Sequence, residues 1–325
     1  VKDGKTVSHV GVWEGDLLIY GSWFKVGMMG AVCTYPDFRG RGYASSLVGD
    51  ALSKMKRDGV DLVLISGDRN LYRRAGCFKA GKIYRYKIPA GKINLREDGI
   101  SIVPYEKGCL NDLVEIYLKE PVRYRRRIQD FKMLAERGLR CTDIPLRIFM
   151  AKIEDKPLAY IATGLFPCEN VPKVWEYAGS RSAVLSIIEH LFKITGSSII
   201  EITVPFHEWE LRGLLGEQGL DIPPLGAQAN MSIINPQSFL EKAGPYLEER
   251  IGENKLSKLR LDVTDEKIKM TLGVEEKAYI DSNDLTFLFF GSPEQSQPKD
   301  DLKPILDFLD KAVPMPTPIY GMNFI

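Results

Sequence analysis

The loop Arg39-Gly40-Arg41-Gly42 restricts the fold more than any other feature of the sequence, because it joins a predicted strand to a predicted helix. Residues 28–35 before the loop are predicted as a strand, and residues 43–57 after it place apolar side chains at helical spacing. Asp58-Gly59 ends the helical pattern. The apolar run at residues 61–66 is typical of a strand buried on both faces. The first part of the chain therefore combines strands and a helix, as in a mixed α/β fold.

Two further strands are predicted before these elements, at residues 6–13 and 16–24. Breaks at Glu14-Gly15 and around Gly27 separate them and predict an antiparallel meander of three strands. A short helix at residues 71–75 follows the buried strand and is stopped by a glycine.

A second unit is predicted to begin near Ile100. Its elements are two helices, three strands, a helix and a buried strand, at residues 109–119, 124–137, 147–153, 158–164, 173–178, 182–195 and 198–204. The last strand of this unit, at residues 198–204, is followed by the segment HEWELRGLLGEQGL. This order of elements repeats that of the strand DLVLIS and the segment DRNLYRRAGC, about 140 residues earlier. We interpret this as a weak internal duplication, which element order supports more than residue identity.

The third segment begins near Met231, and its pattern of helices, strands and loops differs from that of the first two units. A helix at residues 236–251 precedes short strands, a polar loop and a helix at residues 302–312. The proline-rich tail PMPTPIYGMNFI ends on apolar residues. Because chain ends are usually polar and frayed, we expect this tail to dock on the rest of the protein.

Charge and cysteine usage exclude several classes of function. Lys and Arg total 44 against 43 Asp and Glu among 325 residues, so no overall field attracts nucleic acid or an anionic membrane. The five cysteines are widely spaced without a C-x-x-C pair, which argues against a disulfide framework or a zinc site. The most apolar stretches are far shorter than a membrane span. We therefore predict a cytoplasmic protein with no metal, no nucleic-acid partner and no membrane partner.

The glycine-rich loop has a clear chemical use. Glycines let the backbone approach a pyrophosphate closely, and the unpaired N–H groups at the start of a helix stabilise its negative charge. Arg39 and Arg41 would add charge-assisted hydrogen bonds. Pro36 ends strand pairing after Tyr35, which leaves strand edge groups for an extended amide-bearing ligand. Coenzyme A has both features, a pyrophosphate and a peptide-like pantetheine arm.

The pattern V-x-T-x-P-x-x-R-G-x-G-x-A at residues 32–44, followed by Asn70-Leu71-Tyr72-Arg73-Arg74-Ala75-Gly76-Cys77, resembles the acetyl-CoA signature of the GNAT acetyltransferase superfamily. The duplicated layout with an extra C-terminal domain resembles the enhanced intracellular survival (Eis) acetyltransferases. The resemblance implies an α+β (mixed α/β) fold with tandem GNAT-like domains. These would be a catalytic GNAT domain at residues 1–98, a degenerate GNAT-like domain at 99–230 and a sterol-carrier-protein-like α+β domain at 231–325.

The resemblance also implies roles for individual residues. The pantetheine arm of acetyl-CoA would lie along the backbones of Val32, Cys33 and Thr34. The pyrophosphate would be bound by Arg39, Gly40, Arg41, Gly42, Tyr43, Ala44 and Ser45, and Asn70 belongs to the same coenzyme-binding set. Tyr72 would supply a proton to the departing thiolate, to which a phenol with a pKa of about 10 is well matched. The α-carboxylate of Ile325 would be a buried general base.

Two parts of the sequence depart from the family pattern. A full GNAT domain has a strand and two helices before the meander, whereas here the motif begins by residue 32, so we expect N-terminal residues to be absent from this sequence. The second unit has residues 179–183 (GSRSA) where the phosphate loop should be, and we expect it not to bind acetyl-CoA.

The function predicted is an N-acetyltransferase in which a primary amine attacks the thioester directly. The acceptor would be a small molecule such as an aminoglycoside or polyamine, or a protein lysine, and family analogy implies a homo-oligomer. The alternatives are a non-catalytic acetyl-CoA-binding or scaffold protein, and a lipid-binding protein. For Tyr72 the alternative role is a packed core aromatic, and for Ile325 it is simple packing of an apolar terminus.

Three other motifs in the sequence do not indicate a functional site. His207-Glu208-Trp209-Glu210 begins like a zinc-protease helix, but Leu211 stands where the second histidine should be. The arginines at residues 123 and 125–127 are typical of a solvated helix face or a subunit contact. Cys33 is interpreted as strand packing, because direct transfer requires no thiol nucleophile.

Overall fold

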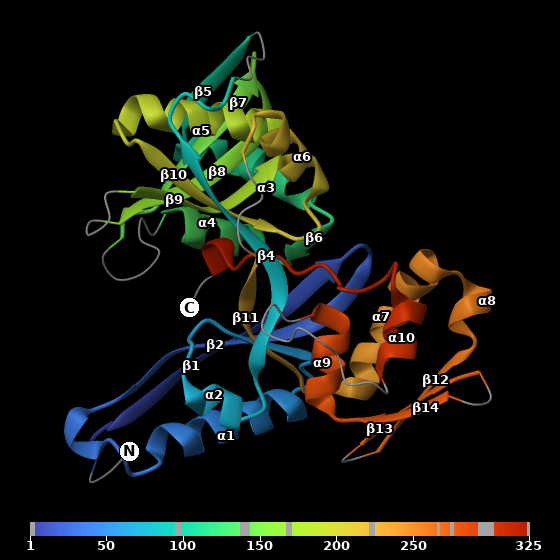
Figure 1. The fold of residues 1–325 in the computed structure, drawn as a ribbon. Coiled ribbons are helices and arrows are strands. Elements are labelled where there is room, and N and C mark those ends of the chain that lie inside the picture. The colour runs from blue at the N-terminus through green and yellow to red at the C-terminus, as the bar shows by residue number, and fades with distance from the viewer. Residues whose placement is uncertain are drawn as a thin grey trace. The chain divides into compact units, whose positions relative to one another are not determined.

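The computed structural model describes residues 4–94, 99–136, 144–166, 171–220, 225–264, 267–273, 276–291 and 302–323 (Figure 1). The chain divides into two compact units. Within the described residues, unit 1 contains residues 4–82 and 227–317, and unit 2 contains residues 83–226 and 318–323. The three predicted domains, with boundaries at 98 and 230, stay a prediction, because a division into compact units does not assign each unit to a domain family.

The sheet of unit 1 is built on a long hairpin. Strand β1 (Ser8–Ile19) pairs antiparallel with β2 (Ser22–Thr34). The two residues between them, Tyr20 and Gly21, both have positive φ, 43° and 92°, which is the backbone that a two-residue hairpin turn requires. β3 (Leu62–Ile65) lies parallel to β2, and β11 (Leu225–Ile233) pairs antiparallel with β3. The strand order in unit 1 is therefore β11-β3-β2-β1.

The predicted three-strand meander is wrong at its breaks. Glu14-Gly15 and Gly27 lie inside the two long strands rather than in turns. Gly27 leaves room for the Met55 side chain, since a Cβ at position 27 would lie 2.7 Å from the Met55 Sδ atom. A glycine that makes room for a helix across the sheet looks, in the sequence, like a glycine that breaks a strand.

Helices pack on both faces of this sheet. α1 (Tyr43–Arg57) and α2 (Asn70–Arg74) form where helices were predicted. α1 buries Val48 and Met55 against Met29 and Val63, in one core cluster. Phe24 faces away from Gly27, because side chains alternate along a strand. Its ring packs against the Phe239 ring of α7, with the ring centroids 5.0 Å apart.

The rest of unit 1 comes from the third segment of the sequence. It contains α7 (Pro236–Ile251), α8 (Glu253–Leu256), α9 (Ser282–Phe290), α10 (Lys303–Leu309) and a separate sheet of β12 (Leu259–Val263), β13 (Ile268–Leu272) and β14 (Glu276–Ile280). α9 was not predicted, although Asp281 caps it with a full capping box. Phe239, Phe289 and Phe290 are fully buried between α7 and α9.

In unit 2 the strands are hydrogen-bonded in the order β5-β7-β8-β9-β10-β4. β9 and β10 are parallel and β10 pairs antiparallel with β4. The elements are β4 (Phe78–Pro89), β5 (Ile100–Pro104), α3 (Leu110–Leu118), β6 (Val122–Tyr124), α4 (Ile128–Glu136), β7 (Arg147–Ile153), β8 (Lys156–Phe166), β9 (Val171–Gly179), α5 (Arg181–Thr195), β10 (Ile199–Pro205) and α6 (Trp209–Glu217). β6 replaces the start of the helix predicted at residues 124–137, and β4 was not predicted.

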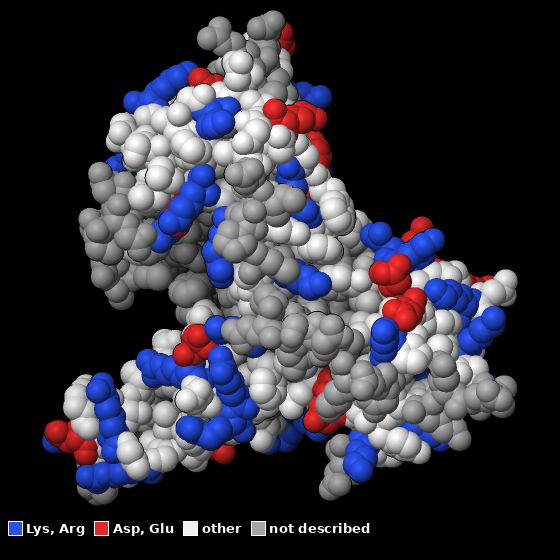
Figure 2. Space-filling view, in the orientation of Figure 1, with Lys and Arg blue, Asp and Glu red and all other residues white. Residues whose placement is uncertain are grey.

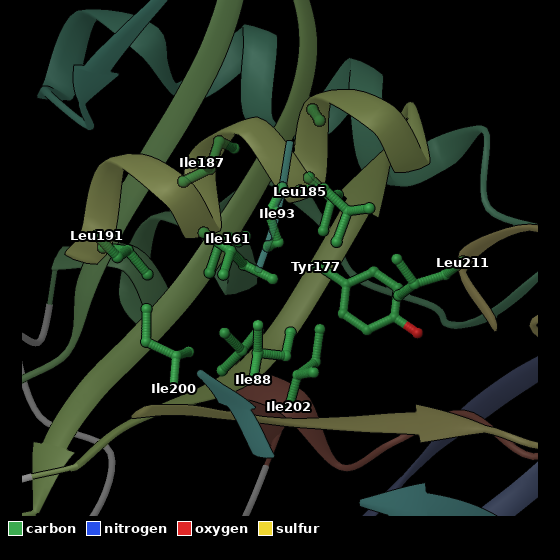
Figure 3. Close-up of a cluster of buried hydrophobic side chains, with 14 of the residues drawn as sticks. Ile88, Ile93, Ile161, Tyr177, Leu185, Ile187, Leu191, Ile200, Ile202 and Leu211 are labelled. Carbon is green, nitrogen blue, oxygen red and sulfur yellow. The ribbon is translucent and has the colours of Figure 1, made fainter. Parts of the chain in front are cut away.

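The core of unit 2 lies between α5 and the sheet. Leu185, Ile187 and Leu191 of α5 meet Ile161 of β8 and Ile202 of β10 (Figure 3). The end of the chain joins this unit, with Gly321, Met322 and Asn323 buried in a 3₁₀ turn. Docking of the tail is confirmed as far as residue 323. No helix in the part of the chain that the structure describes has the length and apolar character needed to cross a bilayer.

Candidate active site

The site of interest in unit 1 begins where two parallel strands part. β2 and β3 are paired from Val26 and Leu62 to Met29 and Ile65, where β3 ends. β2 continues to Thr34 with β1 as its partner on the other side. The register with β1 shifts between Gly11–Gly30 and His9–Cys33, so β2 carries one extra residue there, and Ala31 has a φ of 49°. This bulge bends the end of β2 and exposes one edge of its backbone.

A glycine-rich turn connects β2 to α1. After a 3₁₀ turn at Pro36–Phe38, Gly40 and Gly42 have φ values of 74° and 79°, a backbone that favours glycine. Gly42 is the N-cap of α1, and the Ser46 N–H donates the first helical hydrogen bond to its carbonyl oxygen. The N–H groups of residues 43–45 precede that bond and therefore have no acceptor within the helix. They lie at the positive end of the helix dipole.

A cleft of about 660 Å³ opens along this turn. It is lined by Val32, Cys33, Thr34, Phe38, Arg39, Gly40, Arg41, Gly42, Tyr43, Ala44, Ser45, Arg69, Leu71 and Arg74. The structure thus places ten of the eleven predicted coenzyme-binding residues around one cleft, while Asn70 begins α2 and is not among the lining residues. Lys and Arg atoms gather over the region of α1 and α2 (Figure 2).

Four arginines give the cleft its charge. Arg39 donates from Nε to the Thr34 carbonyl oxygen at 3.1 Å, and Arg69 donates to the Val32 carbonyl oxygen at 3.3 Å. The Arg41 guanidinium lies over the Phe38 ring at 5.4 Å. Arg69 and Arg74, like Phe38 and Leu71, were missed by the sequence analysis. One signal was present, because residues 71 and 74 are three apart and share one face of α2.

Tyr72 lies behind the cleft and not on its wall. Its side chain is 3% exposed and belongs to the core cluster with Val32 and Ile65. The Tyr72 ring packs against Gly67, where an added Cβ would lie 2.8 Å from the Tyr72 Cε2 atom. Burial raises the pKa of the Tyr72 phenol, and the nearby Arg69 charge opposes that rise only in part. The phenol therefore keeps its proton at neutral pH. Ile325 lies outside the described residues.

Replacing Gly42 by Ala tests the turn. We expect coenzyme A to bind at least about fivefold more weakly, because a Cβ at positive φ costs about 1–2 kcal/mol and turns the N–H groups of residues 43–45 away. Gly49→Ala is the matched control in the same helix, where an added Cβ meets open space. Calorimetric titration with coenzyme A measures both. Equal affinity in the Gly42 variant and the wild type would contradict the assignment of this turn.

An ion cluster lies at the start of α5 in unit 2. Arg181, at the start of α5, donates to the carboxylates of Glu120 at 2.8 Å and of Glu208 at 2.8 Å. Ser180 caps the helix by accepting the Ala183 N–H. Protein carboxylates thus lie beside this helix start.

His207 is a partly buried histidine near Arg181. Burial and the Arg181 charge lower its pKa to about 3, so the ring is neutral. Among the described residues, no group of three or more His, Cys, Asp or Glu side chains is placed to hold a metal ion.

Comparison with known proteins identifies similar domains and folds. Residues 1–80 match the family model described as an acetyltransferase (GNAT) domain. No curated protein matches the chain. A GCN5-related N-acetyltransferase from Anabaena variabilis is similar in structure, with 16% identity, a TM-score of 0.64 and coverage of 97% of this chain and 85% of that one.

Two further solved structures are similar. A probable N-acyltransferase of unknown function from Enterococcus faecalis has 15% identity and a TM-score of 0.67 over 98% of this chain and 86% of that one. Eis1 from Mycobacterium abscessus has 14% identity and a TM-score of 0.54 over 74% of this chain and 65% of that one. At these identities the similarity shows the fold.

Proposed function

Residues 1–80 form an acetyltransferase (GNAT) domain, and from this premise we propose that the chain transfers an acetyl group from acetyl-CoA to a primary amine. Acetyl transfer by such a domain implies an amine acceptor. The chemical class of that acceptor belongs to the proposal: an aminoglycoside, a polyamine or a protein lysine. We further propose tandem GNAT-like domains with a sterol-carrier-like third segment, in a cytoplasmic homo-oligomer.

The observation that carries the proposal is the cleft at the start of α1. Three backbone N–H groups without helical acceptors and four arginines surround one 660 Å³ space. A diphosphate fits this chemistry, since both helix starts and arginines bind phosphate oxygens. The bent end of β2 adds a strand edge that suits the amide groups of a pantetheine arm. Coenzyme A joins these two groups in one molecule.

The proposed reaction uses the backbone at the end of β2 and the Tyr72 hydroxyl, which lies outside the cleft lining. The neutral amine attacks the thioester carbonyl carbon, and backbone N–H groups of residues 32–34 stabilise the resulting oxyanion. The carbon–sulfur bond then breaks, and the Tyr72 hydroxyl gives its proton to the departing thiolate. Burial raises the pKa of Tyr72, so the phenol carries the proton that this step requires at neutral pH.

The α-carboxylate of Ile325 is the proposed acceptor of the proton that the amine loses. Adding one residue after Ile325 moves the carboxylate along the chain, and we expect turnover to fall by about 10²-fold or more with unchanged coenzyme A affinity. Steady-state kinetics and calorimetry measure the two quantities. Ile325→Val, which keeps the carboxylate in place, is the control. Full turnover in the extended chain would remove this carboxylate from the mechanism.

The proposed function is tested by binding and by thiol release. Calorimetry should detect binding of coenzyme A to the full chain, and at least one amine from a panel of aminoglycosides, polyamines and lysine peptides should release free thiol from acetyl-CoA. Binding without release for any amine would support the non-catalytic alternative. Absence of binding would reject both assignments.

A further inference from the structure

We propose that Arg126 and Glu176 form a C-terminal latch, an internal binding site in unit 2 that recognises residues 321–323 and so positions the end of the chain. The role of that end in catalysis rests on the proposed function, whereas the latch itself rests on contacts within unit 2. The latch residues are positioning residues and not catalytic ones.

The latch is built on a buried ion pair. The two terminal nitrogens of Arg126 donate to the two carboxylate oxygens of Glu176 at 2.8 and 2.7 Å. The side chains are 1% and 6% exposed. The Arg126 guanidinium also lies 4.2 Å from the centre of the Tyr117 ring, and the Tyr160 hydroxyl donates to Glu176 at 2.6 Å. A planar, bidentate pair of this kind is geometrically specific.

The tail completes the hydrogen bonding of this pair. Arg126 donates from Nε to the Asn323 Oδ1 atom at 2.7 Å and donates to the same oxygen from a terminal nitrogen. The Met322 N–H donates to Glu176 at 2.9 Å. The Met322 side chain is 1% exposed and packs in a core cluster with Tyr160. Both charged partners therefore use the chain end as a hydrogen-bond partner.

The latch also selects the residue at position 321. Gly321 has a φ of 56°, and a Cβ there would overlap the Glu176 side chain. The segment is thus recognised as Gly-x-Asn by backbone conformation, by sterics and by two charged groups.

The Arg126–Glu176 pair holds the C-terminal segment in addition to stabilising unit 2. A buried ion pair is on average a weak source of stability compared with apolar packing. This pair, however, holds a residue only two positions before Ile325, and two residues extend the chain by at most about 7 Å. The latch therefore fixes the chain at Asn323. A latch of this kind serves positional accuracy, which is what a general base requires.

The experiment uses the full chain and the variants Gly321→Ala and Asn323→Leu. Digestion with a broad-specificity carboxypeptidase, followed by mass spectrometry, shows where removal of C-terminal residues stops. In the wild type we expect digestion to stop before Asn323. In both variants it should continue past residue 323. Gly321→Ala is the sharper test, because its last four residues are identical to those of the wild type.

Controls separate the latch from general destabilisation. Ile319→Val alters the same tail but none of the latch contacts, and it should stop digestion where the wild type does. All digestions are done well below the thermal unfolding midpoint of each variant. Digestion that stops at the wild-type position in both latch variants would overturn the proposal.

Kinetics on the same variants test the proposed function separately. With the carboxylate as the base, each variant should lose at least about tenfold in kcat, with coenzyme A affinity within about twofold of the wild type. Extended digestion with an unchanged kcat supports the latch and rejects the terminal carboxylate as the base. The position at which digestion stops therefore tests the latch, and kcat tests whether the terminal carboxylate is the base.

Discussion

Turnover is expected to fall by about 10²- to 10⁴-fold when Tyr72 is replaced by Phe, the range that loss of a positioned general acid produces. The ring would still fill its place between Val32 and Ile65, since only the hydroxyl is removed. Stability and coenzyme A affinity should therefore change little. Because burial raises the pKa of Tyr72, the wild type should lose activity only at strongly alkaline pH, as the phenol ionises. Steady-state rates measured across pH test both statements.

Tyr279→Phe is the control for this variant, because Tyr279 is 60% exposed in β14 and lies outside the cleft. It should retain wild-type turnover. A Tyr72→Phe protein that keeps turnover within threefold of the wild type would leave Tyr72 as a core aromatic residue, the alternative that its sequence context also allows.

Arg126→Met is expected to reduce the free energy of unfolding by about 3–5 kcal/mol, because it leaves the buried Glu176 carboxylate without its cation. Burial alone would raise the pKa of Glu176, but the charge and hydrogen bonds of Arg126 outweigh burial and hold that pKa below its usual value. This stabilisation is present above the pKa of an unfolded Glu and is lost as pH falls through the lower folded pKa. Urea unfolding of the variant and the wild type at neutral pH measures the difference.

Two further variants test the cause of that loss. Arg126→Met combined with Glu176→Gln removes both charges, and it should recover part of the lost stability. Arg127→Ala breaks the exposed pair of Arg127 with Asp130 and should have no measurable effect, since surface pairs contribute little. If Arg126→Met unfolds at the same urea concentration as the wild type, the Arg126–Glu176 pair does not stabilise unit 2.

Local signals predicted the elements that surround the cleft. The helix predicted at residues 43–57 is α1 with the same bounds, because helical spacing and the loop glycines act within a few residues of each other. The run at residues 61–66 contains β3, and the helix at 71–75 differs from α2 by one residue at each end. Where a strand was placed wrongly, as at Gly27, the cause was a side chain from another element, Met55.

The residue sequence by itself determined the glycine-rich turn of unit 1 and the helix that begins there, because the preferences of positive-φ glycines and of apolar periodicity act within a few residues of each other. Tertiary structure alone decided that Arg69 and Arg74 join this turn, and that β11 lies beside β3. It also decided that Asn323 meets Arg126, 197 residues earlier in the chain. Such contacts depend on the packing of whole elements. A charged side chain needs a partner only when folding removes it from water, so its partner cannot be inferred from nearby residues in the sequence.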